Sequence, residues 1–310
     1  MKNVSAQVFM KVRTLFVKIV KFKGGLGNQL FQYSFLKALQ IKYQCTDVKA
    51  DLSYYNDVKN DNIRVPRIEK LNVKIDKAEK NELRNICYFE HSGNPMSLVY
   101  KGSIFVEKTF NKNYFYESDR GYRNPENLLK YHYFDGYWQS WRYLEGIEEI
   151  IKEEIKLKSG ISQKTEETIK KIRTQNAVFL GIRRGDYLAS EKSRKHYGSF
   201  GPEYYLRAVD YIKKRVDNPV FYIFSNDIKW VKDNMEFNCD VIYRDEEEQT
   251  SDVEELFIMS ACQHAIIVNS TFYWWGAWLI DNNEKIVIAP KKWFADDKPI
   301  DIVPDSWVKI

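Results

Sequence analysis

The feature that most constrains the fold is an alternation of short apolar segments with helical segments in the second half of the chain. Fully apolar strands that alternate with helices are typical of a parallel sheet covered on both faces. We therefore predict an α/β chain whose C-terminal half is a Rossmann-like parallel sheet. The apolar segments are Ala177–Ile182, Val220–Phe224, Cys239–Tyr243, Ala265–Val268 and Lys285–Ala289.

The first half opens with a strand, a glycine-rich turn and a helix. Val17–Phe22 alternates like a strand, and Gln29–Tyr43 carries apolar residues on one helical face, with Asn28 as its predicted N-cap. The middle, from Asn56 to Asn127, is polar and has no clear period. Because 310 residues suggest about two domains, we predict domains at 17–155 and 156–310.

Composition excludes several classes of protein. Hydrophobic residues make up 44% of the chain, which excludes intrinsic disorder. The most apolar N-terminal stretch, Val8–Phe22, is interrupted by basic residues and is too short to span a membrane. A net charge of +5 does not indicate a nucleic-acid partner. The basic excess lies in the first 50 residues, which form either a solvated extension or a segment attracted to an anionic membrane surface.

Cysteine usage and metal motifs give no sign of a disulfide framework or a metal site. The four cysteines are scattered and lack the spacing of a zinc site, a pattern that fits thiols in a reducing cytoplasm. Neither D-x-D nor H-E-x-x-H occurs in the chain. We therefore predict no bound metal and no signal peptide, and a cytoplasmic location, with the cytoplasmic face of the inner membrane as the alternative.

The strongest candidate for chemistry is Gly181-Ile182-Arg183-Arg184-Gly185-Asp186. It follows a predicted strand directly and so lies at the carboxyl edge of the sheet, where ligands bind in open α/β folds. The guanidinium fork matches phosphate oxygens, and two adjacent arginines can serve a diphosphate. Asp186 can orient an arginine or act as a base. The competing interpretation is a surface ion pair of little energetic weight.

Three other segments are open to two interpretations each. The loop Gly24–Asn28 offers backbone N–H groups to an anion at a helix start, or it is a structural turn, since Leu30 replaces the third glycine of a dinucleotide fingerprint. Ser225 and Asp227 either cap the next helix or contact a nucleotide. The aromatic segment Phe272–Trp278, after Asn269-Ser270-Thr271, is either core or a platform for a ligand, and we assign most of it to the core.

Four segments, in this order, resemble the bacterial α-1,2-fucosyltransferase family. They begin at Gly24-Gly25-Leu26-Gly27-Asn28-Gln29, Arg183-Arg184-Gly185-Asp186-Tyr187, Phe224-Ser225-Asn226-Asp227 and Asn269-Ser270-Thr271-Phe272-Tyr273-Trp274-Trp275. The resemblance implies a GT-B-like two-domain glycosyltransferase that needs no metal and no cofactor. It implies inverting transfer of L-fucose from GDP-L-fucose to the 2-hydroxyl of a galactose-terminated oligosaccharide or glycolipid, in glycan, O-antigen or capsule biosynthesis.

The resemblance also implies roles for single residues. Arg183 contacts the β-phosphate and Arg184 supports it. Asp186 is the candidate base, although two adjacent arginines lower the pKa of a carboxyl and make it a poor base; Glu191 is the fallback. Glu255 is assigned to the guanine, and Ser270 with Thr271 to the ribose or phosphate. The remaining donor-binding candidates are Gly25, Gly27, Asn28, Gln29, Ser225 and Asp227.

Two features depart from the family pattern or remain open. Gly181 stands where the family usually has histidine, so a donor contact made by imidazole is lost or replaced, and the first 16 residues have no counterpart. Tyr131–Tyr143, in which seven of thirteen residues are aromatic, is either an acceptor platform or a packed strand. An NAD-dependent Rossmann oxidoreductase and a non-catalytic carbohydrate-binding protein are the alternative functions.

Overall fold

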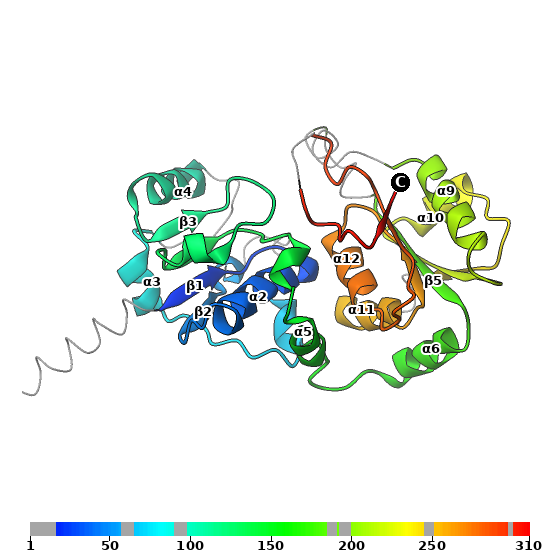
Figure 1. The fold of residues 1–310 in the computed structure, drawn as a ribbon, viewed down its shortest axis with the longest axis horizontal. Coiled ribbons are helices and arrows are strands. Elements are labelled where there is room, and N and C mark those ends of the chain that lie inside the picture. Colours follow the sequence, from blue (N-terminus) through cyan, green and yellow to red (C-terminus); the bar gives the residue numbers. More distant parts are fainter. Residues whose placement is uncertain are drawn as a thin grey trace, which may run out of the picture. The chain divides into compact units, whose positions relative to one another are not determined.

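The computed structural model describes residues 17–56, 65–89, 98–184, 191, 200–244, 251–296 and 300–310. These residues form two α/β units, each built on its own parallel sheet (Figure 1). The first unit extends to Lys158 and also contains Ile300–Ile302; the second comprises Ser159–Pro299 and Val303–Ile310. Two separate parallel α/β units match the predicted GT-B-like class.

The first unit contains a four-stranded sheet in the order β2-β1-β4-β3, with all strand pairs parallel. Helix α4 packs beside the edge strand β3 (Figure 1). The strands are β1 (Lys18–Lys21), β2 (Val48–Asp51), β3 (Tyr114–Tyr116) and β4 (Tyr133–Asp135). The α-helices of this unit are α2 (Leu26–Ile41), α3 (Lys80–Ile86), α4 (Leu98–Phe110) and α5 (Glu148–Glu154). Short 3-10 helices lie at Ser53–Tyr55, Arg67–Lys70, Pro125–Leu128 and Trp141–Tyr143.

Helix α2 begins earlier than predicted, which corrects the assignment of Asn28 as its N-cap. Gly25 is the N-cap, in extended conformation, and its carbonyl accepts from the N–H groups of Asn28 and Gln29, both at 3.0 Å. Gly24 precedes it at φ +81°, a left-handed conformation that favours glycine. The helix therefore begins three residues earlier than the side-chain preference of asparagine suggested, and Asn28 lies inside its first turn.

The polar middle of the chain contains regular structure that its sequence did not indicate. Helices α3 and α4 and strand β3 all lie between residues 80 and 116. Only Ile86 of α3 and Glu107 of α4 are buried. Because so few of their residues face the core, these elements show little hydrophobic periodicity.

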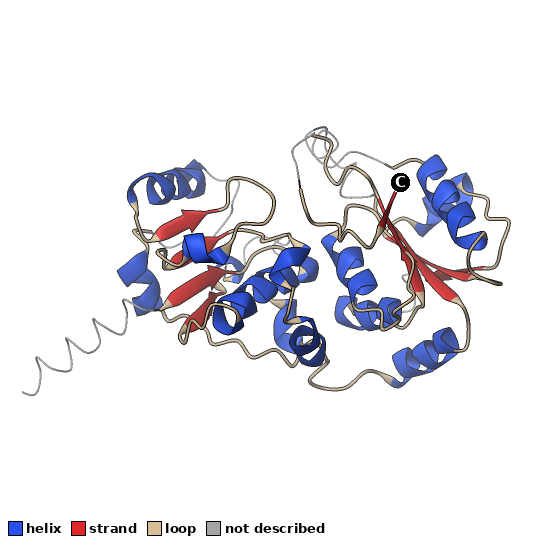
Figure 2. Cartoon of the chain, viewed as in Figure 1, coloured by secondary structure: helices blue, strands red, loops and turns tan. Residues whose placement is uncertain are grey.

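The second unit contains a six-stranded parallel sheet in the order β10-β9-β8-β5-β6-β7 (Figure 2). When β5 to β10 are numbered 1 to 6 and the sheet is read from β7 to β10, the strand order is 3-2-1-4-5-6. This is the order of a doubly wound Rossmann sheet. The predicted fold class, α/β with a Rossmann-like C-terminal half, is confirmed, and β10 is an addition to it. The strands are β5 (Ala177–Ile182), β6 (Val220–Ser225), β7 (Val241–Arg244), β8 (His264–Ile266), β9 (Val287–Ala289) and β10 (Val308–Lys309).

Helices cover both faces of this sheet, with α11 and α12 on one side and α9 and α10 on the other (Figure 1). Trp274 and Trp275 of α12 are fully buried, which confirms that the aromatic segment there is mainly core. No helix of the described residues is both long and apolar enough to cross a membrane. The helices are α6 (Gln163–Arg173), α9 (Pro202–Lys213), α10 (Ile228–Asn234), α11 (Asp252–Ser260) and α12 (Thr271–Trp278).

Candidate active site

The second sheet has one topological switch point, between β5 and β8. The chain passes from β5 to β6 on one side, whereas β8 pairs with the other side of β5. In open α/β sheets, ligands bind outside the carboxyl ends of the strands at this point. The predicted residues at or after the ends of β5, β6 and β8 therefore share one edge of the sheet. They are Arg183, Arg184, Ser225, Asp227, Ser270 and Thr271.

Arg184 is held by contacts from the segment after β6. Its backbone N–H donates to Asn226 Oδ1 at 3.0 Å, and its guanidinium carbon lies 3.5 Å from the centroid of the Trp230 ring. Its Nε is 3.9 Å from Asp227 Oδ2 and has no hydrogen-bond partner among the described residues. Stacking on an aromatic ring fixes the plane of the guanidinium, so Arg184 presents a fixed cation at this edge.

Three other residues predicted for chemistry belong to the segment after β5. Arg183 is partly exposed and directly follows the last residue of the strand. Glu191 is exposed. Asp186, the candidate base, and its neighbour Gly185 lie outside the described residues. Their predicted roles stay predictions.

The residues after β6 cap the next helix. Ser225 Oγ accepts from the N–H of Asp227 at 3.0 Å, and Asp227 Oδ1 accepts from the N–H of Trp230 at 3.1 Å. Asp227 is thus the N-cap of α10, while its second oxygen faces Arg184. Capping is one of the two interpretations that the sequence left open, and the nucleotide contact stays a prediction.

The residues at the starts of α12 and α11 differ in exposure. Ser270 is the buried N-cap of α12 and accepts from the N–H of Tyr273, whereas Thr271 is partly exposed. Glu255 is partly exposed in the first turn of α11. Contacts of Thr271 and Glu255 with a nucleotide stay predictions.

Tyr273 occupies the space of the missing histidine side chain at position 181. A Cβ at Gly181 would lie 2.6 Å from the Cγ and one Cδ of the Tyr273 ring. The buried Tyr273 hydroxyl lies 3.3 Å from the carbonyl oxygen of Ile182 and 3.2 Å from that of Phe224. It thereby bridges the ends of β5 and β6. Sequence reasoning assigned this aromatic segment mainly to the core and did not foresee the bridge. The available signal was glycine at 181 together with a bulky residue at 273.

The N-terminal glycine loop is stabilised from within. Gln29 is fully buried, its Nε2 donates to the carbonyls of Gly24 and Val65, and its Oε1 accepts from the N–H of Ile68. Gly25 and Gly27 are buried as well, whereas Asn28 is partly exposed and accepts from Gln139 Nε2 at 2.9 Å. These contacts favour the structural-turn interpretation, and donor binding by the loop stays a prediction.

The carboxyl edge of the first sheet carries a buried ionic cluster. Asp135 is 1% exposed and accepts from Lys23 Nζ at 2.5 Å and from the Tyr114 hydroxyl at 2.7 Å. Lys21 Nζ lies 3.8 Å from the same carboxylate. Burial alone would raise the pKa of Asp135, but the charges of the two lysines outweigh it and hold that pKa well below its usual range.

The aromatic segment Tyr131–Tyr143 serves mainly as core. Trp138 is fully buried, and its ring stacks on Phe35 of α2 with centroids 3.8 Å apart. Tyr137 is exposed over 42% of its surface, with its ring centroid 4.6 Å from Lys23 Nζ, and Tyr131 and Trp141 are partly exposed. Most of the segment is therefore packing, and an acceptor platform formed by its less buried rings stays a prediction.

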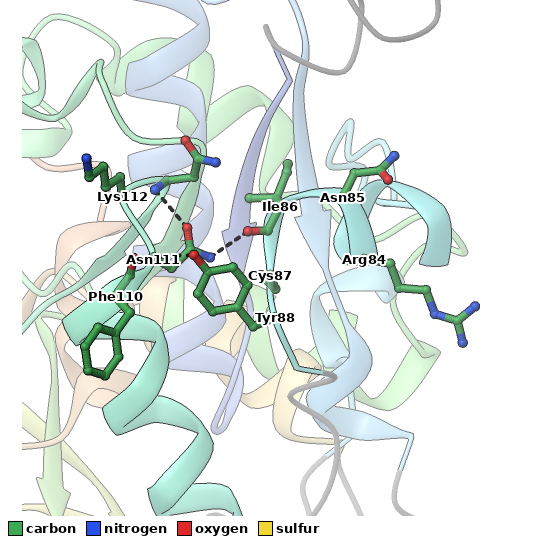
Figure 3. A pocket seen from close by; sticks show the side chains of 9 residues that line it. Arg84, Asn85, Ile86, Cys87, Tyr88, Phe110, Asn111 and Lys112 are labelled. Carbon is green, nitrogen blue, oxygen red and sulfur yellow. Dashed lines mark hydrogen bonds between the residues drawn. The ribbon is translucent and has the colours of Figure 1, made fainter. Parts of the chain in front are cut away.

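A cavity of about 350 Å³ lies at the amino edge of the first sheet, between the ends of α3 and α4 (Figure 3). Asn111 crosses one side of it and donates to the carbonyl of Ile86 at 2.6 Å. None of the predicted site residues lines this cavity. Within the described parts of the chain, no group of three or more histidine, cysteine or acidic residues is arranged to hold a metal ion.

Comparison with known proteins identifies relatives along the whole chain. It is 31% identical to an alpha-1,2-colitosyltransferase of Escherichia coli over 95% of this chain and 99% of that protein. It is 30% identical to the O-antigen biosynthesis glycosyltransferase WbnK of Escherichia coli, over 93% and 98%. Galactoside alpha-(1,2)-fucosyltransferase 1 of Leontocebus fuscicollis is 28% identical over 46% of this chain and 42% of its own length.

Solved structures that match this chain include fucosyltransferase NodZ from Bradyrhizobium, with 13% identity, a TM-score of 0.43 and coverage of 84% of this chain and 92% of NodZ. POFUT1 in complex with GDP gives 12% identity and a TM-score of 0.44, with coverage of 92% and 97%. The sequence model of glycosyl transferase family 11 matches residues 16–310. The match spans both α/β units, and the chain therefore belongs to glycosyl transferase family 11.

Proposed function

We propose that this family 11 glycosyltransferase moves L-fucose from GDP-L-fucose to the 2-hydroxyl of a galactose-terminated oligosaccharide or glycolipid, with inversion. The family membership does not favour the oxidoreductase or the non-catalytic alternative. The relatives named as α-1,2 transferases support the linkage. The relative named for O-antigen biosynthesis supports a role in making surface glycans.

The observation that carries the proposal is the pair of arginines at the switch point of the second sheet. When the bond between the fucose C1 and the phosphate oxygen breaks, negative charge develops on the departing GDP. A cation already fixed in place stabilises that charge without reorganisation. Arg184, stacked on Trp230, is such a cation, and Arg183 adjoins it at the end of β5. In this proposal Arg183 contacts the β-phosphate and Arg184 supports it.

The other donor contacts follow from the same edge. Thr271 and Glu255 are partly exposed, which supports contacts with the ribose or phosphate and with the guanine. Ser225, Asp227 and Ser270 already bind helix N–H groups, so their part is to shape the helix starts that face the nucleotide. The absence of D-x-D from the sequence supports transfer without a metal, because the arginines then supply the positive charge.

The acceptor is assigned to the first unit, with domains divided near residues 155 and 156. Its support is the exposed Tyr137 ring, since sugars present apolar faces that suit aromatic platforms. For a lipid-linked acceptor, the basic N-terminal residues favour a peripheral place at the cytoplasmic face of the inner membrane.

A colitosyl donor is the second candidate, because a relative that matches 95% of this chain is a colitosyltransferase. The test incubates the full chain with GDP-L-fucose or with the colitosyl nucleotide, over a panel of β1,3- and β1,4-linked galactosides, and assigns the product linkage by NMR. We expect an α-1,2-fucosylated product. Transfer of colitose alone would replace the donor assignment, and binding of NAD but not GDP in calorimetry would overturn the proposed function.

A further inference from the structure

Helix α4 turns its one acidic residue toward the core of the first unit and several of its apolar residues toward solvent. Glu107 is fully buried, whereas Leu98 is 85% exposed and Phe105 is 58% exposed. A helix at the surface of a globular protein ordinarily shows the opposite arrangement, with its apolar stripe against the core and its charged residues outside. Packing against the sheet therefore does not explain why the outer side of α4 is apolar.

Hydrogen bonds from the inner side of α4 fix its orientation. The Glu107 carboxylate accepts from the N–H of Phe89 at 2.9 Å and from Asn111 Nδ2 at 2.7 Å. Two turns earlier in the helix, the Tyr100 hydroxyl accepts from Nζ of Lys21, a residue of β1, at 2.9 Å. Residues seven positions apart lie on one side of a helix. The contacts of Tyr100 and Glu107 therefore hold that side against the unit, and the opposite side is the exposed one.

The exposed side of α4 combines apolar residues with positive charge. Leu98 and Phe105 lie two turns apart along it. Lys101 and Lys108, also two turns apart, are exposed on one flank of this row, and Lys112 is exposed just beyond the end of the helix. Because the only acid of the helix is buried, the exposed part of α4 carries positive charge alone.

The apolar surface continues from α4 onto the segment that follows α3. Tyr88 and Phe89 in that segment and Phe110 at the end of α4 are exposed as well. The Tyr88 hydroxyl donates to the carbonyl of Phe110 at 3.4 Å, and both residues line the cavity shown in Figure 3. Exposed apolar patches mark contacts with other proteins or with membranes. The α4 patch comprises Tyr88, Phe89, Leu98, Val99, Phe105 and Phe110.

The charge beside the α4 patch discriminates between the possible occupants. A second copy of the chain, related by a twofold axis, would bring the same lysines together and repel them. Lysine is depleted in protein–protein interfaces, whereas lysines that flank an apolar helical face are typical of helices that lie on membrane surfaces. With 13 residues, α4 is too short to span a bilayer. These properties favour an anionic membrane surface as the occupant.

We propose that the α4 patch binds the surface of an anionic membrane, with α4 parallel to the membrane plane. Leu98 and Phe105 enter the boundary between headgroups and acyl chains, about 5–10 Å deep, and the lysines beside them contact lipid phosphates. Such binding holds the enzyme at the surface where a lipid-linked acceptor is found. The inference does not depend on which sugar is transferred, and it assigns the membrane contact to α4 rather than to the basic N-terminal residues.

The test measures co-sedimentation of the full chain with vesicles of phosphatidylethanolamine and phosphatidylglycerol, and with neutral vesicles of phosphatidylcholine. We expect the wild type to bind the anionic vesicles at least about tenfold more tightly than the neutral ones. Phe105→Ser should weaken binding to the anionic vesicles by about tenfold or more, because a large apolar side chain no longer leaves water. Lys101→Gln combined with Lys108→Gln should weaken it by about 10–30-fold at low salt, and by less at high salt.

Two matched control variants change the same kinds of residue elsewhere in the first unit. Ile150→Ser replaces a 40%-exposed apolar residue of α5. Lys152→Gln combined with Lys156→Gln removes the same positive charge from lysines paired with Glu149 and Glu153. Both controls should bind the anionic vesicles within threefold of wild type, because neither alters the α4 patch.

Three results would overturn the proposal. The first is a wild type that does not bind anionic vesicles, or a Phe105→Ser variant that binds them as wild type does. The second is a concentration-dependent dimer in analytical ultracentrifugation that Phe105→Ser abolishes, since a second copy would then cover the patch. The third is a thermal unfolding temperature lowered by both Phe105→Ser and Leu98→Ser, which would mean that the patch packs within the chain. If Phe105→Ser alone does not fold, Leu98→Ser decides by the same loss of vesicle binding.

Discussion

The contact between Gly181 and Tyr273 makes a quantitative prediction about the second unit. Alanine at 181 would place a methyl group 2.6 Å from the Cγ and a Cδ of the Tyr273 ring. These atoms lie at the root of the ring, so a rotation of its far end does not relieve the clash. The ring must move, and its hydroxyl then loses the carbonyls of Ile182 and Phe224.

The size of the effect follows from the packing. Overpacking a filled core costs about 1–3 kcal/mol, so Gly181→Ala should lower the free energy of unfolding by that amount. Tyr273→Ala removes a 5%-exposed aromatic side chain and should cost about 3–5 kcal/mol. In the double variant the new methyl group enters the vacated space. The two effects should therefore fall short of additivity by about 1–3 kcal/mol.

The assay is urea unfolding followed by tryptophan fluorescence, which reports mainly on the second unit because six of the eight tryptophans lie there. Calorimetric titration with GDP adds a functional measure, since β5 and β6 end at the proposed donor site. Gly181→Ala should weaken GDP binding, and Tyr273→Ala combined with it should not weaken binding further. A Gly181→Ala variant as stable as wild type, or strictly additive effects, would refute the reasoning.

Three further predictions concern the arginines, the metal and the ionic cluster. Arg183→Ala should reduce kcat at least about 10²-fold, because a fixed charge on the leaving group is lost, without changing the thermal unfolding temperature. EDTA should leave the rate of GDP release unchanged. Asp135→Asn should destabilise the first unit by about 3–5 kcal/mol in urea unfolding, because Lys21 and Lys23 lose their buried counter-charge.

Each of these has a defined contrary result. Turnover of Arg183→Ala within tenfold of wild type would refute the charge-stabilising role, and a strict Mg²⁺ or Mn²⁺ requirement would refute metal-free transfer. The contribution of Asp135 to the free energy of unfolding depends on pH. The pKa of Asp135 is lowered on folding, so its ion pairs stabilise the fold above the unfolded pKa of about 3.9. This stabilisation is lost as the pH falls below that value. Wild type and Asp135→Asn should therefore converge in stability at strongly acid pH, and a constant difference would contradict the ion-pair account.

The second unit was predictable because its strands are buried on both faces. Each strand then reads as an apolar run, and the sequence order of runs and helices predicts parallel pairing. The arginines could be found for the same reason: Arg183 directly follows a recognisable strand end. Helix α4 escaped recognition because it buries little more than Glu107, so its hydrophobic pattern carries no trace of a core-facing stripe.

Residues whose role depends on distant partners could not be found by local patterns. Glu117 acquires its place from N–H groups twenty residues later in the chain, and nothing in the residues around it in sequence indicates those partners. Tyr273 could be recognised from the sequence as an aromatic residue. Its bridge between two strand ends, however, depends on the absence of a side chain at Gly181, and only the fold shows this. Gln29 was recognised as part of a motif, whereas its three backbone contacts required the fold.

The return of Ile300–Ile302 to the first unit determines how this enzyme can be dissected. Asp301 accepts from the N–H of Tyr122 at 2.9 Å and lies 3.6 Å from Arg142 Nε, and Ile302 is fully buried. A gene fragment that stops at Lys158 would therefore encode an incomplete first unit with an uncovered apolar surface. Separate expression of the two halves requires the tripeptide to be grafted back through a linker, and exchange of whole units between family members must move this segment together with the N-terminal portion.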